Sequence, residues 1–303
     1  MRKAKIIVNP NANLGRAVQR AARLKPIADE FEGVDWAGTV YPRHAISLAH
    51  QAAEQGYERV IAVGGDGTAH EVLNGLMKIP HDGRPVMGLV PLGSGNDFSH
   101  MVGASPNPEQ ALRQALTNDS HRIDIATIES NDGQREFWGN TLGIGFDATV
   151  TIRSRNVTMV KGFLIYLVAV MQTIAFNHSA PLIEVQTDEE IFSQEFLMLV
   201  LCNGGREGGG FNVQPEARPD DGLLNYVGVK RISRVRMLRL VPEVMKGTHG
   251  RFSEVRMGTF KQLELKTDFP LTIHIDGEIY SGMDSQVNQL KIGLLSKELQ
   301  VAS

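Results

Sequence analysis

The residues whose types and spacing most clearly suggest chemistry form the motif Gly64-Gly-Asp-Gly-Thr68, which follows the apolar run Val60–Val63. A glycine turn between a strand and a helix suits phosphate, because the unpaired N–H groups and the positive dipole end of the helix attract anions. Glycine also lets a polyphosphate lie against the backbone. The motif therefore predicts a phosphate-binding loop. Asp66 in this loop could cap the helix or hold Mg²⁺ or a phosphate-bound water, and we expect the second role.

Two further loops follow apolar runs in the same way. Asn9–Gly15 follows Ala4–Val8, and Pro91–Asn96 follows Val86–Val90. Each run has the length of a strand and each loop precedes a helical pattern, which predicts a mostly parallel sheet with its loops gathered at one edge. We expect one nucleotide site assembled from all three loops. No G-x-x-x-x-G-K-[ST] motif occurs, which excludes a P-loop mechanism.

Two local patterns have plainer interpretations. Thr68-Ala-His-Glu71 matches a capping box at the start of the helix that follows the glycine loop. Gly143-Ile-Gly-Phe-Asp-Ala148 fits the dinucleotide fingerprint G-x-G-x-x-[GA], yet it lies among short β-type runs and not in a clear βαβ unit. We therefore interpret the second match as a coincidence.

The elements that must position these loops change character after Arg122, where short β-type runs replace the alternation of strand and helix. Turn signals such as Asn131-Asp-Gly133 predict antiparallel pairing of these runs. The predicted fold class is α/β, with an N-terminal Rossmann-like three-layer nucleotide domain and a second antiparallel, β-rich, sandwich-like domain. We expect the first domain over residues 1–122 and the second over 123–288, with a tail from about 289 to 303 that returns to the first.

One helical stretch, Gly162–Phe176, is apolar apart from Gln172 and Thr173. As a helix these residues would span only about 22 Å. A helix that crosses a bilayer spans about 30 Å, which takes about 20 residues. We expect a core helix here. A wall of an apolar ligand pocket and a membrane-facing surface remain open as alternatives.

Charge and composition exclude several classes of protein. The 303 residues carry 31 basic and 34 acidic side chains, a net charge of −3, which excludes a polycation built to bind nucleic acid along its whole length. The one cysteine, Cys202, cannot form an intrachain disulfide, and the short apolar run at the N-terminus is no secretory signal, so we expect a cytoplasmic protein.

Residues 230–266 hold ten Lys/Arg against three Glu, an excess of +7. This segment either attracts anionic lipid head groups or is a solvated face.

Taken together, the motifs resemble the diacylglycerol kinase catalytic family. The motifs that carry this resemblance are Val63-Gly-Gly-Asp-Gly-Thr68, Pro91-Leu-Gly-Ser-Gly-Asn-Asp-Phe98 and Gly143-Ile-Gly-Phe-Asp147. Later segments are similar to the second-domain motifs of the soluble bacterial lipid kinases, relatives of sphingosine and ceramide kinases with an NAD kinase-like nucleotide domain. These segments are Asn203, Gly208–Phe211, Pro215–Ala217, Asp220–Leu223 and Asp276–Glu278.

The resemblance implies ATP-dependent transfer of a phosphoryl group to a lipid hydroxyl such as that of diacylglycerol, with ATP and Mg²⁺ as cofactors. ATP would lie on the first domain and the lipid in a cleft between the two. The implied partner is lipid at the membrane surface, which the enzyme would meet as a peripheral protein at the inner membrane face. A homodimer is left open, and nucleic acid is not expected.

The family's functional residues carry over to matching positions of this sequence. Glu278 takes the place of the proton acceptor, with Asp276 as its neighbour and Asp66 as a further catalytic carboxylate. Asp221, with the backbone carbonyls of Arg218 and Leu223, matches a structural magnesium site. The implied nucleotide-contacting residues are Asn9, Pro10, Asn11, Ala12, Asn13, Thr39, Gly64, Gly65, Asp66, Gly67, Thr68, Ala69, His70 and Ser94.

Three positions depart from the family pattern. This chain has Asn13 where the family usually has glycine, His70 where it has asparagine, and Ser94 where it has threonine. Asparagine tolerates left-handed backbone and serine keeps the hydroxyl, so two of these changes preserve the chemistry. His70 could alter a phosphate or metal contact.

Two other functions compete with a lipid kinase. An NAD kinase shares the Gly-Gly-Asp-Gly loop, but it needs an Asn-Glu pair that binds ribose, and no Asn-Glu dipeptide occurs in the chain. A nucleotide or lipid sensor without turnover could keep the glycine loops. The retention of Asp66, Asp221 and Glu278 together argues against a sensor.

Overall fold

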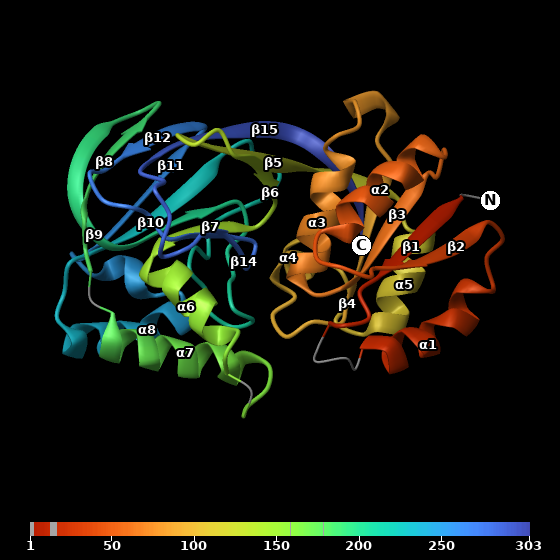
Figure 1. The fold of residues 1–303 in the computed structure, drawn as a ribbon, viewed down its shortest axis with the longest axis horizontal. Helices are drawn as coiled ribbons and strands as arrows, with labels where there is room; N and C mark the ends of the chain where they lie inside the picture. Colours follow the sequence, from red (N-terminus) through yellow and green to blue (C-terminus); the bar gives the residue numbers. More distant parts are fainter. Residues whose placement is uncertain (1–2, 13–16, 158, 178) are drawn as a thin grey trace. The chain divides into compact units, whose positions relative to one another are not determined.

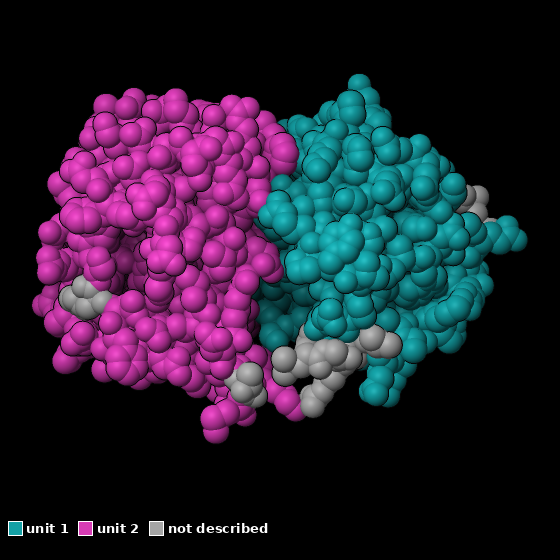
Figure 2. Space-filling view, in the orientation of Figure 1, with its two compact units in different colours: residues 1–125, 296–303 teal, residues 126–295 magenta. Residues whose placement is uncertain are grey.

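The computed structural model describes residues 3–12, 17–157, 159–177 and 179–303. The chain forms two compact units (Figure 2). Unit 1 comprises residues 1–125 and 296–303, and unit 2 comprises residues 126–295. The C-terminal segment thus belongs to the same unit as the N-terminal half.

Unit 1 is built on a parallel sheet with the strand order β2-β1-β3-β4-β15. Its strands are β1 (Ala4–Val8), β2 (Val34–Gly38), β3 (Arg59–Gly64), β4 (Val86–Pro91) and the end of β15 (Gln289–Ala302). Apart from Arg59 at the start of β3, the strands β3 and β4 are continuous apolar runs, as expected for strands covered on both faces.

Helices cover the two faces of this sheet (Figure 1). Helices α1 (Ala17–Ala28) and α5 (Pro108–Thr117) share one apolar cluster with residues of β1, β3 and β4. Helices α2 (His44–Glu54) and α3 (Asp66–Leu76) pack together on the other face. The short helix α4 (Asp97–Met101) and the 3₁₀ helix η1 (His81–Gly83) complete the unit. The expected three-layer α/β arrangement is confirmed.

Unit 2 is an antiparallel sandwich in which the long strand β9 (Ile191–Cys202) takes part in both sheets. The first half of β9 pairs with β8, and its second half pairs with β7 and β10. One sheet contains β14 (Glu278–Ser281), β13 (Ile273–Ile275), β7 (Thr141–Gly145), β10 (Leu224–Lys230) and β11 (Val255–Phe260). The other contains β8 (Leu182–Thr187), β12 (Gln262–Lys266), β15, β5 (Ser120–Ser130) and β6 (Arg135–Trp138). The predicted sandwich-like fold is confirmed.

Alternation along β9 separates two apolar cores. Leu199 and Leu201 point into the core between the sheets, whereas Val200 and Cys202 point into a second cluster on the outer face. Three helices cover that outer face: α6 (Phe146–Ser154), α7 (Phe163–Phe176) and α8 (Arg234–Lys246), followed by the 3₁₀ helix η2 (His249–Arg251).

Helix α7 is only partly buried, which differs from the core helix expected from its composition. Its buried residues are Ala169, Val170, Thr173 and Ile174, and they form one stripe against the cluster beneath. The remaining apolar side chains of α7 are half-buried or exposed. Within the described ranges, every helix is too short or too polar to cross a bilayer.

Candidate active site

The loops predicted to bind nucleotide begin at one edge of the parallel sheet of unit 1. The backbone N–H of Asn9 donates to Val63 O at 3.1 Å, and Thr39 N–H donates to Val8 O at 2.9 Å. These bonds continue the parallel pairing of β2, β1 and β3 beyond the strands themselves. The residues that follow these three strands therefore lie side by side.

The turn from β3 into α3 requires glycine for steric reasons. Gly65 is the N-cap of α3, and the helix begins at Asp66. A Cβ on Gly64 would lie 2.3 Å from the Thr68 Oγ1, and a Cβ on Gly93 would lie 2.5 Å from the Cα of Gly65. The loop after β4 thus touches the loop after β3 at two residues without side chains.

Asp66 joins these two loops. Its Oδ2 accepts the N–H of Asn96 at 2.7 Å, and its Oδ1 accepts the N–H of Phe98 at 3.0 Å. Asn96 has left-handed backbone, with φ of 57°, and its Oδ1 accepts the N–H of Gly93 at 2.8 Å. The carboxylate therefore fixes the second loop against the first, while Ser94 lies exposed in that second loop.

The residues of the first turns of α3 face inward. Thr68, Ala69 and His70 are buried, and the His70 Nε2 lies 3.3 Å from the Asn74 Nδ2 one turn further along the helix. Among the described residues, the buried Thr68 Oγ1 has no hydrogen-bond partner. The imidazole of His70 thus lies on the interior side of helix α3.

The predicted capping box at Thr68 is wrong. The N-cap of α3 is Gly65, and Glu71 instead caps α2, because its carboxylate accepts the N–H groups of Arg43 at 2.9 Å and Ala45 at 3.0 Å. This contact ties the Thr39–His44 segment to α3. Pro10, Asn11 and Ala12 form the turn after Asn9, whereas Asn13 lies outside the described residues.

In unit 2, the predicted catalytic carboxylates lie at the hairpin between β13 and β14. Asp276 and Gly277 form its two-residue turn, with φ of 50° and 82°. The Asp276 carboxylate is 3% exposed and accepts three backbone N–H groups, from Gly139 at 3.0 Å, Asn140 at 2.8 Å and Thr141 at 3.2 Å. These bonds anchor the turn and place Asp276 in a supporting position.

Glu278 follows this turn and is the accessible carboxylate of the pair. Its side chain is 45% exposed, and its Oε2 lies 2.7 Å from the Arg155 Nη2 at the end of α6. Arg155 also lies near Gly277, with its Nη2 3.4 Å from the carbonyl oxygen. A carboxylate held in this way can accept a proton from a group that arrives from solvent.

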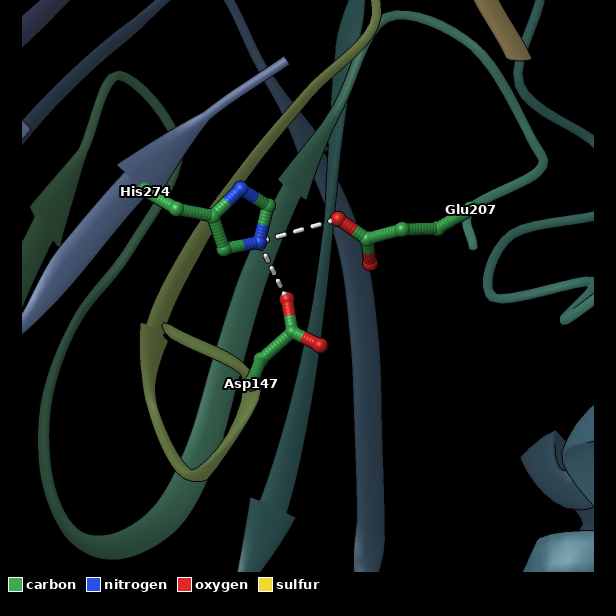
Figure 3. A group of neighbouring side chains, drawn as sticks. All are labelled: Asp147, Glu207 and His274. Carbon is green, nitrogen blue, oxygen red and sulfur yellow. Dashed lines mark hydrogen bonds and ion pairs between the residues drawn. The ribbon is translucent and has the colours of Figure 1, made fainter. Parts of the chain in front are cut away.

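Three further titratable groups gather beside this hairpin (Figure 3). The buried His274 Nε2 lies 2.8 Å from the Asp147 Oδ2 and 2.9 Å from the Glu207 Oε1. Burial alone would lower the pKa of His274, but the carboxylates of Glu207 and Asp147 raise it to about 10. Burial and the Asp147 charge raise the pKa of Glu207 to about 7. The three residues come from β13, α6 and the loop after β9, and the charge of each affects the pKa of the others.

The same three residues are spaced like metal ligands, since their ligand atoms lie within 4.8 Å of one another. We call Asp147, Glu207 and His274 the ion-pair cluster, after the two ion pairs that His274 makes with the carboxylates.

The cluster explains the Gly143-Ile-Gly-Phe-Asp147 motif. A Cβ on Gly143 would come within 1.9 Å of the Asp147 Oδ2 and 2.3 Å of the His274 Nε2. Gly145 adopts φ of 77° as the N-cap of α6, where a Cβ would lie 3.0 Å from Leu197 O. The strand before α6, β7, pairs antiparallel with β9 and β13, so the dinucleotide fingerprint has no βαβ unit here.

The segment predicted to hold a structural magnesium is an exposed turn. The Asp221 Oδ1 accepts the N–H of Leu223 at 3.0 Å, and both Asp221 and Arg218 are exposed. The magnesium assignment to Asp221, Arg218 and Leu223 stays a prediction.

Sequence reasoning missed the ion-pair cluster. Asp147 ends the motif Gly143–Asp147, and His274 stands two residues before Asp276-Gly277. Their positions beside glycine turns were the one sign in the sequence that these side chains belong to the site. Glu207 gave no signal, because it lies in a loop whose path depends on the whole sandwich.

An α/β unit with glycine loops at its strand ends, followed in the chain by an antiparallel sandwich, matches two family models. Residues 3–128 match the diacylglycerol kinase catalytic domain, and residues 140–295 match the YegS C-terminal NAD kinase beta sandwich-like domain. These matches define the class of protein as a kinase, a phosphotransferase. The chain belongs to the YegS-type diacylglycerol kinase family.

Named relatives span most of the chain. A diacylglycerol kinase of Bacillus subtilis is 26% identical over 93% of this chain and 91% of its own length. A protein of Chromohalobacter salexigens, named a probable YegS-like lipid kinase, is 29% identical over 77% of this chain and 73% of its own. A solved diacylglycerol kinase structure from Bacillus anthracis has the same fold, with a TM-score of 0.71 at 20% identity, covering 99% of this chain and 96% of that one.

Proposed function

We propose that this protein transfers the γ-phosphate of ATP to a lipid hydroxyl such as that of diacylglycerol. One observation supports the proposal most directly. This kinase-family chain has, in unit 1, two loops that meet through glycines and, in unit 2, the half-exposed carboxylate of Glu278. The names of the relatives supply the substrate class, because they are called diacylglycerol kinase or lipid kinase.

The β3–α3 turn is the proposed phosphate site. A triphosphate needs close approach to backbone and a positive field, and the residues Gly64, Gly65 and Gly67 at the start of α3 supply both. The contact between Gly65 and Gly93 keeps the second loop in place beside this turn. We assign the nucleotide contacts to these loops and to the adjacent residues Asn9 and Thr39.

Mg²⁺ fits the residues at this turn. Asp66 is the first residue of α3, beside the proposed phosphate site, and carboxylate oxygens are ligands that Mg²⁺ prefers. When bound, Mg²⁺ would neutralise charge that develops on the phosphates. Asp66 is the side chain that we assign to hold it.

Glu278 is the proposed general base. A lipid alcohol is a poor nucleophile at neutral pH, and a positioned carboxylate that accepts its proton accelerates such a step by about 10²–10⁴. The Arg155 guanidinium holds the carboxylate, and the Asp276 anchor fixes the turn from which it projects. The proton of the lipid hydroxyl would move to a Glu278 carboxylate oxygen.

The test is a phosphorylation assay with labelled ATP, Mg²⁺ and a panel of acceptors in detergent micelles: diacylglycerol, phosphatidylglycerol, ceramide, sphingosine, undecaprenol and NAD. We expect label in a lipid, and a Glu278→Gln variant slower by about 10²–10⁴ with unchanged ATP affinity. Glu264→Gln is the matched control, because Glu264 is an exposed carboxylate of unit 2 paired with Lys291. Label in NAD alone would favour the NAD kinase alternative, and label in no acceptor would favour a sensor.

A further inference from the structure

Helix α7 presents an apolar stripe to solvent. Leu164, Val168, Met171 and Ala175 are spaced at i, i+4, i+7 and i+11, which places them on one side of a helix. Leu164 is 51% and Met171 is 46% exposed, although Ala169, Val170, Thr173 and Ile174 already bury the opposite stripe. A helix that is apolar on both sides is normally covered on both, by protein or by lipid.

The apolar surface continues onto α8. The two helices lie next to one another on the same side of unit 2 (Figure 1), share one apolar cluster, and are linked by the Arg234 Nε, which donates to Ile174 O at 3.1 Å. Val235 of α8 is 77% exposed, and Leu238 is also exposed. We call this surface, defined by Leu164, Met171, Phe176, Val235 and Leu238, the α7–α8 face.

Exposed cations lie on α8 and in the segments that precede α7 and α8. Helix α7 itself has no charged residue. The exposed basic residues nearby in the sequence are Lys161 before α7, Arg231 before α8, and Arg234 and Arg239 on α8. Among the described residues, Arg234 and Arg239 have no carboxylate partner. Phe176, which is 75% exposed, lies 5.6 Å from the guanidinium of Arg153. Exposed apolar side chains with a basic border match a bilayer surface, where acyl chains lie beneath anionic phosphates.

We propose that the α7–α8 face docks on the surface of an anionic lipid bilayer. The α7 stripe enters the boundary between head groups and acyl chains, and Arg234 and Arg239 contact lipid phosphates. The apolar stripe distinguishes this surface from a basic segment that acts by charge alone. The inference rests on the proposed function, because a kinase of a membrane lipid must reach its substrate in the bilayer.

The experiment measures sedimentation of the full chain with phosphatidylcholine vesicles that contain or lack phosphatidylglycerol. We expect binding to the anionic vesicles, weakened by salt, and a loss of about tenfold or more in the partition coefficient of the double variant Leu164→Ser/Met171→Ser. Ile191→Ser is the matched control, because Ile191 is an exposed apolar residue of unit 2 on β9, outside the α7–α8 face. It should bind vesicles like the wild type.

A second measurement locates the helix. A Met171→Trp variant should show tryptophan fluorescence quenched by brominated acyl chains in anionic vesicles, whereas Ile191→Trp should not. Equal vesicle binding by the wild type and the double serine variant would overturn the proposal. Concentration-dependent dimerisation of the wild type that the serine variant lacks, without vesicle binding, would assign the face to a second copy of the chain.

Activity in micelles separates the two proposals. Detergent presents diacylglycerol without a bilayer, so the serine variant should keep wild-type rates there and lose activity only on vesicles. If the wild type phosphorylates no lipid in micelles, the proposed function fails. If it does, and vesicle binding is unaffected by the α7 substitutions, only the membrane-docking inference fails.

Discussion

Gly93 packs directly on Gly65, so closely that a single methyl group on Gly93 would lie 2.5 Å from the Cα of Gly65 and 2.9 Å from the Asn96 Oδ1. The two loops at the ends of β3 and β4 can therefore touch only through residues that lack a Cβ. This contact, and the Asp66 carboxylate beside it, give the first two predictions.

Gly93→Ala should push the two loops apart. Overpacking of this kind costs about 1–3 kcal/mol of unfolding free energy, and the displaced loop should also weaken ATP binding. Urea unfolding and calorimetric titration with ATP measure the two effects. Gly38→Ala is the control, since a Cβ on Gly38 meets nothing within 4 Å. Wild-type values for Gly93→Ala would show that the loops adjust freely.

Asp66→Asn should lower both stability and turnover. The amide keeps one acceptor but turns an NH₂ group toward the N–H of Asn96 or Phe98, which leaves a donor unsatisfied at a cost of about 1–3 kcal/mol. It also removes the charge available to a cation. Chemical unfolding and the micelle assay check this. A variant with wild-type stability but no turnover would mean that Asp66 acts on the cation alone.

Asp276→Asn should destabilise unit 2 while leaving Glu278 chemically intact. Three backbone N–H groups lose a charged acceptor, and we expect a loss of about 1–3 kcal/mol in the free energy of unfolding. Asp284→Asn is the control, because Asp284 is an exposed turn residue. If Asp276→Asn unfolds like the wild type and loses all activity, Asp276 is a catalytic residue and not the anchor of the turn.

The ion-pair cluster should make stability depend on pH. The pKa of His274 is raised from 6.5 to about 10, so its contribution is fully present below about pH 6.5 and disappears as the pH rises toward 10. The raised pKa of Glu207 acts in the same direction between 4.5 and about 7. Urea unfolding at several pH values should show the wild type losing its advantage over His274→Gln as the pH rises. A constant difference would contradict the charged state of His274.

The parallel sheet and its loops were predictable because each strand, loop and helix is encoded locally. The short apolar run Val60–Val63 bounded by glycines favours a strand followed by a turn, and β3 forms there. The capping residue was not predictable in this way. Glu71 has the right spacing to cap its own helix, yet it caps α2, because the packing of α2 on α3 brings Arg43 and Ala45 within reach.

The sandwich contributes the parts of the candidate site that sequence could not provide. Asp147 and Glu207 are 60 positions apart in the sequence and meet only because β7 and β9 pair and His274 lies between them. The exposure of α7 could not be predicted either, because an all-apolar sequence is compatible with a helix that is covered on one side or on both. Tertiary packing alone determines both features.

The pairing of β15 with β4 has a consequence for biosynthesis. Val301 and Ala302 add the last parallel strand of unit 1 beside Met87 and Gly88, more than 200 positions earlier in the chain. A ribosome must therefore synthesise all of unit 2 before unit 1 receives the strand that pairs with β4. Until then the edge of β4 stays open on the nascent chain, and unit 2 can fold first although it is translated second. Completion of the unit 1 sheet thus waits for the synthesis of Val301 and Ala302.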